Sequence, residues 1–312
     1  MSAPLGIEAP DYGGEISEIR RVSVFGPGLI GGSVAMAIKS RCPHLHLTIW
    51  GRNPASLKEI RRLNLADSVE NDASKAAADA DLVILCTPVG SLEAIAATIA
   101  PHLRPDAVVT DAGSVKGCVV QRLEPLLGSR FVGAHPMAGS EKSGISAARA
   151  DLFAGAPCIL TPEASTDPRA LRLVGALWTT LGSRLSIMAP AEHDRIVARV
   201  SHLPHALAFG LVNLVTDTLP EGSQNLAGGS YRDATRVAAS DPALWTGILT
   251  ENCTEVAAAL RDMANLLQAM ASELGKENPD SLLDFLKRGK EHGASLRFPP
   301  PEENTYSTRN HS

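Results

Sequence analysis

VSVFGPGLIGGS, at residues 22–33, places the pattern GxGxxG between two segments of different character. Residues 22–25 form a short apolar run that is typical of a buried strand, and residues 29–39 have the spacing of a helix. A strand, a glycine-rich turn and a helix in this order are typical of the first unit of a dinucleotide-binding domain. The stretch therefore predicts an α/β fold that begins near residue 20.

Each glycine of the pattern has its own expected role. Gly26 permits the tight turn, Gly28 lets the backbone approach a pyrophosphate, and Gly31 lets the helix pack closely on the strand. The free amides at the helix start, at Leu29 and Ile30, are expected to face the phosphates. The alternative is a glycine turn with a purely structural role, and the strand–turn–helix context argues against it.

Short, wholly apolar runs alternate with helical stretches as far as Met188. Strands that are covered by helices on both faces are apolar throughout, so this pattern predicts a parallel α/β sheet. The expected strands are residues 22–25, 46–50, 82–86, 108–110, 131–134 and 157–160. The expected helices are residues 29–39, 54–63, 116–127 and 169–181. Ser91 is expected to cap a further helix, because its hydroxyl can accept a free amide of the first turn.

The character of the sequence changes at Pro190, and residues 191–292 contain no convincing strand. Apolar side chains widen over residues 211–215 until they cover most of a helix, which predicts burial in a bundle or a subunit contact. Asp241-Pro242 predicts another helix start, with Asp as the cap and Pro at the first helical position.

We therefore expect an α/β Rossmann-type dinucleotide-binding domain at residues 20–190, followed by an all-α substrate and dimerisation domain at residues 191–292. Residues 1–19, with two prolines, a glycine pair and several acids, are expected to be a flexible arm. Residues 293–312, with three consecutive prolines and then polar residues, are expected to be a disordered tail.

Composition excludes several classes of protein. The 312 residues are 44% apolar and 20% charged, with a net charge of only -5, which is a globular balance without the basic excess of a nucleic-acid binder. No apolar run approaches the roughly 20 residues that cross a bilayer, and the polar, acidic N-terminus is unlike a secretory signal. The five cysteines are scattered without a CxxC pair, so we expect a reducing cytoplasm and neither disulfides nor a zinc ribbon.

The segment IWGRNP at residues 49–54 bears on the cofactor. An acid at the end of the second strand would accept from both ribose hydroxyls, but no acid is present. Arg52 can pair with a 2′-phosphate, which slightly favours NADP over NAD; the alternative is that Arg52 stacks on adenine or is solvated. Thr87 and Pro88 follow the strand at residues 82–86, where such sheets bind ligands, and are expected beside the cofactor.

Four segments with chemically capable side chains fall at expected strand or helix ends. They are DAGSVK at residues 111–116, GAHPMAGSEKSG at 133–144, HDRIVARVSHLPH at 193–205, and YRDATR at 231–236. The last carries two arginines four residues apart, on one face of an expected helix.

Taken together, these segments resemble the prephenate/arogenate dehydrogenase family, in the same order and over about residues 20–290. HPMAGSEKSG and HDxxxxxxSHLPHA are far more specific than the glycine pattern. The resemblance implies a domain that binds NAD or NADP, and a helical domain that builds a homodimer and half of the active site. It also implies oxidative decarboxylation of prephenate to 4-hydroxyphenylpyruvate, or of arogenate to tyrosine, in tyrosine biosynthesis.

The resemblance implies that His135 is the catalytic base and that Ser114 hydrogen-bonds it and fixes its orientation. A ring carbinol gives hydride to the nicotinamide, carbon dioxide leaves, and the ring becomes aromatic. The enzyme must then place the substrate and accept the hydroxyl proton, which a neutral histidine can do near neutral pH. The alternative is a histidine that serves only as a turn or cap beside Pro136.

Arg236 matches the family's substrate-binding arginine, and its planar fork suits a carboxylate. Differential binding favours the surviving side-chain carboxylate, because the charge of the departing one disperses in the transition state. The other expected pocket residues are His205, Ser201, Arg232, Glu141 and Trp245.

Purely structural roles remain open for several of these residues. Arg232 can be a surface ion pair, Glu141 a capping carboxylate and Trp245 a core aromatic. His193 either caps the interdomain helix or approaches the site. No metal is expected at His202 and His205, because a proline interrupts their helical spacing and no third ligand is evident.

Departures from the wider family also matter. We expect no chorismate mutase segment before the Rossmann domain and no ACT domain after residue 292, so tyrosine inhibition, where present, would act at the active site or the dimer interface. Prephenate and arogenate are not distinguished. The competing functions are another two-domain NAD(P)-dependent hydroxy-acid dehydrogenase, which would usually rely on a lysine, and a non-catalytic NADP-binding module.

Overall fold

The computed structural model describes residues 7–8, 16–274 and 280–296. These residues fall into two compact units, Met1–Ala259 and Leu260–Ser312. Most of the predicted arm, and residues 297–312 of the predicted tail, lie outside the described residues.

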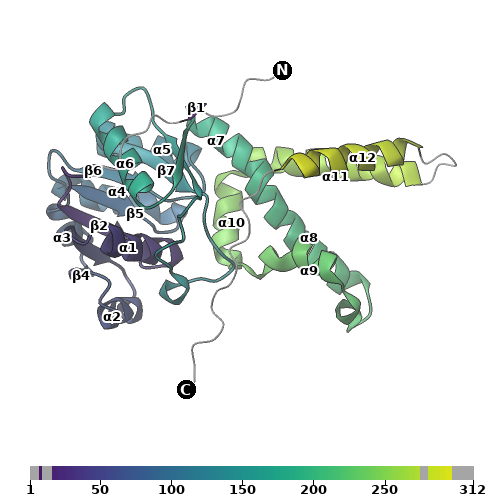
Figure 1. Cartoon of the computed structure of the whole chain (residues 1–312), viewed down its shortest axis with the longest axis horizontal. Coiled ribbons are helices and arrows are strands. Elements are labelled where there is room, and N and C mark those ends of the chain that lie inside the picture. Colours follow the sequence, from purple (N-terminus) through teal and green to yellow (C-terminus); the bar gives the residue numbers. More distant parts are fainter. Residues whose placement is uncertain (1–6, 9–15, 275–279, 297–312) are drawn as a thin grey trace. The chain divides into compact units, whose positions relative to one another are not determined.

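A nine-stranded sheet is the centre of the first unit among the described residues (Figure 1). The strands are β1 (Ile7–Glu8), β2 (Arg21–Phe25), β3 (His46–Trp50), β4 (Ser68–Glu70), β5 (Leu82–Leu85), β6 (Val108–Asp111), β7 (Phe131–Pro136), β8 (Pro157–Thr161) and β9 (Arg184–Ile187). Their order is β1-β9-β8-β7-β6-β5-β2-β3-β4. All pairs are parallel except β1 with β9 and β7 with β8.

The run β4-β3-β2-β5-β6-β7 has the 3-2-1-4-5-6 order of a doubly wound dinucleotide-binding sheet. The predicted Rossmann-type fold is therefore confirmed. In such a sheet, ligands bind outside the carboxyl ends of the strands where the order reverses, here between β2 and β5.

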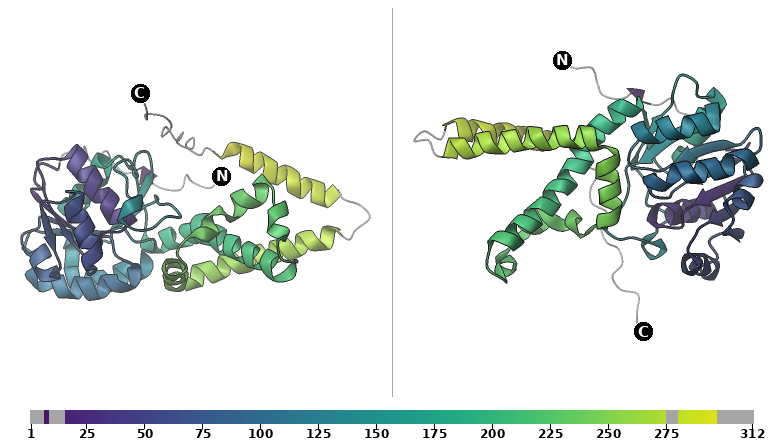
Figure 2. Two further views of the ribbon diagram at one scale, coloured as in Figure 1. Left: turned by 90° about the horizontal axis from the view of Figure 1, so that it is seen from below. Right: turned by 180° about the vertical axis from the view of Figure 1, so that it is seen from behind.

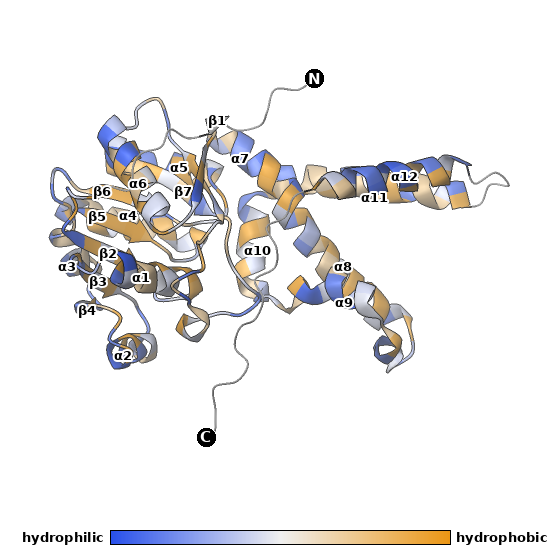
Figure 3. Cartoon of the chain, viewed as in Figure 1, coloured by the Kyte–Doolittle hydropathy of each residue, from blue (hydrophilic) through white to orange (hydrophobic). Residues whose placement is uncertain are grey.

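Helices cover both faces of this sheet, which explains the wholly apolar strands. One face carries α1 (Leu29–Arg41), α2 (Pro54–Arg62) and α6 (Pro168–Thr180), and the other carries α3 (Ala73–Ala78), α4 (Leu92–Ile99) and α5 (Gly117–Leu127). The left view of Figure 2 shows α1, in purple, and the blue α4 and α5 on opposite sides of the sheet. Figure 3 shows the strands β5 and β6 in the orange of hydrophobic residues.

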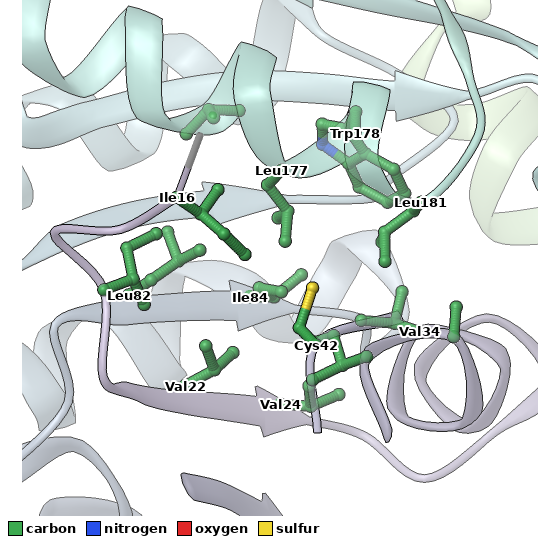
Figure 4. Close-up of a cluster of buried hydrophobic side chains, with 14 of the residues drawn as sticks. Ile16, Val22, Val24, Val34, Cys42, Leu82, Ile84, Leu177, Trp178 and Leu181 are labelled. Carbon is green, nitrogen blue, oxygen red and sulfur yellow. The ribbon is translucent and has the colours of Figure 1, made fainter. Parts of the chain in front are cut away.

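Alternate residues of each strand serve the two faces. Leu82 and Ile84 of β5 point to the same side as Leu177 and Trp178 of α6 (Figure 4), whereas Val83 and Leu85 belong to the opposite cluster. Full burial of one such side chain stabilises the fold by about 1.5–3 kcal/mol. The core therefore holds the strand ends, and the loops that follow them, in fixed positions.

From Pro190 onward the described chain contains helices and loops but no strand, with 3-10 turns at Ser223–Leu226 and Arg236–Ala239 between the longer helices. The helices are α7 (Pro190–Val197), a π-helical turn (Ala198–His202), α8 (Leu203–Thr218), α9 (Gly229–Thr235), α10 (Pro242–Glu251), α11 (Cys253–Leu274) and α12 (Asp280–Ser295). The predicted start of α10 is confirmed, because the Asp241 side chain accepts a hydrogen bond from the Ala243 amide. None of the described helices is long and apolar enough to cross a lipid bilayer.

The prediction that Ser91 caps α4 is wrong. A 3-10 turn at Val89–Ser91 precedes α4, so Ser91 has helical dihedral angles instead of the extended ones of a capping residue. Its hydroxyl donates to the Pro88 carbonyl instead.

Three strands and one helix were not predicted: β1, β4, β9 and α3. Part of the predicted arm is in fact paired, since Ile7 and Glu8 lie opposite Ile187 and Ser186 in β9. The domain boundary near residue 190 stays a prediction, which the end of β9 at Ile187 and the start of α7 at Pro190 support.

Candidate active site

The glycine turn between β2 and α1 shows which of its glycines the fold itself requires. Gly26 has a positive φ of 104°, and a Cβ there would lie 2.8 Å from the Cys86 carbonyl oxygen. A Cβ on Gly31 would lie 2.0 Å from the Gly26 oxygen. A Cβ on Gly28 would meet no atom within 4 Å. Gly28 is therefore free of structural demands, and its open side fits a ligand that approaches the backbone.

This open space lies at the start of α1. Gly28 is the N-cap residue, no side chain caps the helix, and its first turn has no acid. The first amides of a helix lack partners within it and carry partial positive charge, so this end suits phosphate groups. Thr87 adds an orphaned donor beside the turn: its Oγ1 is buried without a partner among the described residues, and its methyl group is close to Gly26. These features fit a dinucleotide.

The predicted ribose partner lies at the end of β3. A Cβ on Gly51 would lie 2.9 Å from Pro27 of the glycine turn, so the two loops touch. Arg52 follows directly and is exposed, and the next residue, Asn53, caps α2 through the Ala55 amide. Arg52 is thus placed close to the turn with its side chain in solvent.

His135 stands at the end of β7, and 7% of its surface remains exposed. Its Nδ1 lies 2.8 Å from Nε2 of His193 in α7, and Nδ1 of His193 lies 2.8 Å from Oδ1 of Asp194. The two imidazoles meet edge to face, with ring centroids 5.0 Å apart. The expected hydrogen bond from Ser114 to His135 is not seen among the described residues, so the ring is oriented by His193.

Asp194 is fixed by the amides at the start of α5. Its Oδ1 accepts from the Lys116 amide and its Oδ2 from the Gly117 amide, each at 2.8 Å. A Cβ on Gly117 would lie 2.7 Å from Oδ2, so only glycine allows this approach. Burial raises the pKa of Asp194, but the hydrogen bonds from His193 and from both amides outweigh it and hold that pKa below 3.8. The carboxylate is ionised at neutral pH.

The hydrogen bonds assign the tautomers of both rings. A carboxylate only accepts, so Nδ1 of His193 carries the proton that faces Asp194. Neutral His193 must then accept at Nε2, which makes Nδ1 of His135 the donor. The lone pair of His135 is left on Nε2, which makes no hydrogen bond among the described residues. This atom is free to accept a proton from a ligand.

A buried ion pair fixes the strand segment that leads to His135. Lys116 and Asp111 are in contact, and neither side chain is exposed. Nζ of Lys116 also donates to the Ala134 carbonyl at 2.9 Å, and Asp111 accepts from the amide of Ala134 at 3.1 Å and from that of Gly113 at 2.8 Å. Both polar groups of residue 134 are thereby held by this pair.

Burial and neighbouring charge keep the imidazoles neutral. Burial lowers the pKa of His135 well below 6.5, and positive charge on His193, Lys116 or His202 lowers it further. Burial also lowers the pKa of His202 to about 4 and lowers that of His193, although Asp194 opposes the shift of His193. His135 is therefore a neutral base at physiological pH.

A second group of side chains comes from the helices. His205 stacks on Trp245 with ring centroids 3.6 Å apart, and its Nδ1 donates to the Ser201 carbonyl at 2.9 Å. Burial lowers the pKa of His205, as does the charge of Arg236, which places that guanidinium nearby. Arg236 is exposed and lies 3.5 Å from Glu141.

These contacts connect five of the predicted pocket residues, and Arg232 takes part in none of them. Trp245 packs against Val115, which follows Ser114, so the helical group adjoins the loop between β6 and α5. Arg232 is exposed on α9, and Arg236 follows the end of this helix as the first residue of a 3-10 turn (Arg236–Ala239). That the two arginines share one helical face stays a prediction.

Residues that the sequence did not reveal complete the site. Asp194 was visible only as part of an HD pair, and its partners lie 77 and 78 positions away. Asn252 is buried, donates to the Asp194 carbonyl at 2.9 Å, and lies 3.2 Å from Nδ1 of His202. The spacing of Asp111 and Lys116 gave no sign that their side chains pair. Contacts between side chains of distant segments leave no periodic pattern in the sequence.

Comparison with known proteins assigns both parts of the chain. The family model for the nucleotide-binding domain of prephenate dehydrogenase matches residues 34–187, and that for its dimerization domain matches residues 189–288. The cyclohexadienyl dehydrogenase of Zymomonas mobilis is 35% identical over 89% of this chain and 96% of its own length. The prephenate dehydrogenase of Bacillus subtilis is 33% identical over 87% of this chain and 74% of its own.

A solved structure is similar over the same extent. The crystal structure of A. aeolicus prephenate dehydrogenase, in complex with hydroxyphenyl propionate and NAD+, aligns with a TM-score of 0.84 and 36% identity. The alignment covers 88% of this chain and 98% of that one.

The neutral imidazoles predict how stability depends on pH. In the folded protein the pKa values of His135, His193 and His202 are lowered from 6.5. Below about pH 6.5 the unfolded chain therefore binds more protons than the folded chain, which favours unfolding. We expect the free energy of unfolding to decrease as the pH is lowered from about 7 to about 5, by up to about 1.4 kcal/mol per pH unit for each imidazole. Urea titrations across this range, on wild type and His202→Gln, measure it. The variant should show a shallower slope, and an unchanged slope would contradict the assignment.

Proposed function

The chain belongs to the prephenate dehydrogenase family, and from that premise we propose that it converts prephenate to 4-hydroxyphenylpyruvate, or arogenate to tyrosine, by oxidative decarboxylation with NAD(P). This places it in tyrosine biosynthesis. The observation that carries the proposal is a neutral, buried His135 whose Nε2 is left free by its contact with His193.

The cofactor would be held by the turn between β2 and α1. The open face of Gly28, the amides of Leu29 and Ile30, and the unpartnered Thr87 hydroxyl support this placement, with Pro88 next in the chain. When bound, the nicotinamide accepts a hydride from the ring carbon of the substrate.

The chain's own contribution is to move a proton and to place the substrate. We assign acceptance of the hydroxyl proton to Nε2 of His135, which a neutral imidazole can perform near neutral pH. Ser114, half-buried in the loop between β6 and α5, is proposed to bind near the same hydroxyl. Loss of carbon dioxide makes the ring aromatic and drives the reaction forward.

The substrate is proposed to lie against the helical group of side chains. The exposed Arg236 would bind the surviving side-chain carboxylate, and the stacked pair of His205 and Trp245 would line the pocket together with Ser201 and Glu141. Arg232, exposed on α9, is proposed only to add positive potential.

The helical part is proposed to form a homodimer. The family model for this part is that of a dimerization domain, and Figure 3 shows hydrophobic segments along α8. In the first unit Leu214 of α8 is exposed, and in the second unit the exposed leucines are Leu260, Leu266, Leu267 and Leu274 of α11 and Leu283 and Leu286 of α12. Burial of these side chains against a second copy would remove them from water. We also propose a cytoplasmic location, which five free cysteines support.

Turnover tests the proposed function directly. Prephenate and arogenate are each mixed with NAD or NADP, and absorbance of the reduced cofactor is followed. We expect His135→Asn to lower kcat about 10²- to 10⁴-fold with little change in KM, because the proton acceptor is lost. His44→Asn, which removes an exposed imidazole, is the control and should behave as wild type. No turnover of either substrate by wild type would overturn the function, and a wild-type kcat in His135→Asn would overturn the base.

The cofactor preference rests on Arg52. We expect Arg52→Ala to raise KM for NADP roughly tenfold and KM for NAD far less, because only NADP carries the 2′-phosphate that the guanidinium would bind. Lys58→Ala, an exposed cation on the neighbouring α2, controls for general loss of positive charge. Equal effects of Arg52→Ala on both cofactors would show that Arg52 does not touch the phosphate.

The dimer is tested by sedimentation equilibrium. We expect wild type to have twice the 32.8 kDa mass of one chain, and Leu267→Lys to shift the mass toward that of a monomer, because a charge would be buried in the interface. Leu126→Lys, on α5 outside the helical part and 38% exposed, is the matched control and should stay dimeric. A monomeric wild type would contradict the proposal.

A further inference from the structure

A chain of hydrogen bonds continues behind the proposed base. It begins at the free Nε2 of His135, passes through His193, and ends at Asp194, which two amides of α5 hold in place. Orientation of His135 alone would need one acceptor. The second imidazole and its own carboxylate are therefore available for a further role.

We propose that His193 is a proton carrier in the reaction: as Nε2 of His135 takes the substrate's hydroxyl proton, Nδ1 of His135 passes its proton to Nε2 of His193, which holds it beside Asp194. The inference rests on the proposed function. The inference adds His193 as the site of the positive charge, and the base that accepts the substrate's proton remains His135. We refer to His135, His193 and Asp194 as the proton relay.

The geometry allows the transfer between the two rings without their movement. The two nitrogens that would exchange the proton are 2.8 Å apart, within the range of a strong hydrogen bond. The proton on Nδ1 of His193 stays where it is, donated to Asp194 at 2.8 Å. A protonated His193 would thus donate from both nitrogens, and each donor already has its acceptor in place.

The surrounding charges favour the cation on His193 over His135. His135 on β7 faces the cation of Lys116 and the rings of His193 and His202, and no carboxylate among the described residues raises its pKa. His193 on α7 also faces Lys116, but it has Asp194 in contact and Asp111 of β6 nearby, and both raise its pKa. A proton taken up by the pair is therefore more stable on the inner ring.

The fold keeps the carboxylate from turning away. Asp194 accepts at both oxygens from Lys116 and Gly117, and its own carbonyl accepts from Asn252. Both rings are buried, His193 completely, so water does not compete for the proton. The relay is therefore a buried site that can hold one proton.

The reaction releases the hydroxyl proton only temporarily, so a group of the protein must hold it until the product forms. The hydroxyl O–H bond breaks toward His135 while the ring carbon gives its hydride to NAD(P). The bond to the carboxylate then breaks, carbon dioxide leaves, and its electron pair enters the ring. The oxygen regains the proton as a phenol, so the relay returns to its starting state and the only net oxidant is the cofactor.

His193→Gln separates a proton carrier from a mere orienting group. The glutamine oxygen can accept from Nδ1 of His135 and keep the ring oriented, but the side chain cannot hold a proton. We expect kcat to fall about tenfold or more while KM for substrate stays within roughly a factor of two. The acidic limb of the kcat/KM profile should move to lower pH, because His135 must then carry the charge alone.

His44→Gln is the matched control and should leave both kcat and the profile unchanged, since His44 is an exposed imidazole outside the site. Turnover by wild type together with an unmoved acidic limb in His193→Gln would overturn the relay alone. An acidic limb moved to higher pH would also overturn it. Absence of wild-type turnover would instead overturn the proposed function.

A second measurement needs neither a variant nor a cofactor. Nitrogen NMR of 15N-histidine-labelled wild-type protein reports which ring nitrogen of each histidine carries the proton. We expect Nδ1–H tautomers for both His135 and His193, with the His193 proton strongly deshielded by Asp194. An Nε2–H tautomer at His135 would overturn the relay even in an active enzyme, because no proton would then face His193.

Discussion

The carboxylate of Asp194 is the constraint on which the site depends. It accepts the amides of Lys116 and Gly117 at the start of α5 and the Nδ1 proton of His193 in α7. Charge-assisted hydrogen bonds of this kind are about twice as strong as neutral ones, and the helix end adds favourable potential. One side chain thereby ties the first helical segment to the dinucleotide-binding part and sets the tautomer of two histidines.

Burial lowers the pKa of both histidines, but the nearest charges act in opposite directions: Lys116 lowers the pKa of His135, whereas Asp194 raises that of His193. The ion pair of Lys116 with Asp111 holds residue 134 in position but places a cation beside His135. The desolvation cost of a buried ion pair offsets much of its Coulombic gain, whereas loss of one partner would leave an uncompensated buried charge. The result is a base that is neutral when the substrate arrives, beside a second ring whose cation Asp194 stabilises.

The prediction of the fold succeeded where the sequence is periodic and failed where it is not. The apolar strands of the doubly wound sheet and the glycine turn were found, because burial on both faces leaves a clear pattern. The strands β4 and β9 are short and only partly buried, so neither apolar runs nor alternation marked them. For the site, His135 and the helical side chains were recognised from motif resemblance. Asp194, Asn252 and the Lys116–Asp111 pair were not, because their roles depend on contacts between distant segments.

The loop that contains HPMAGSEKSG continues to residues that contact the helix of the glycine turn. After β7 the chain must reverse to form the antiparallel β8, and on the way it packs on α1. A Cβ on Gly32 would lie 2.2 Å from the Ile145 side chain, and the Arg149 amide donates to the Ser33 hydroxyl at 3.0 Å. The loop that begins at the proposed base therefore ends against the helix whose N-terminus would hold the phosphates. A shift of this loop would move both the proposed base and the helix that would hold the phosphates, so one connection aligns the base with the cofactor.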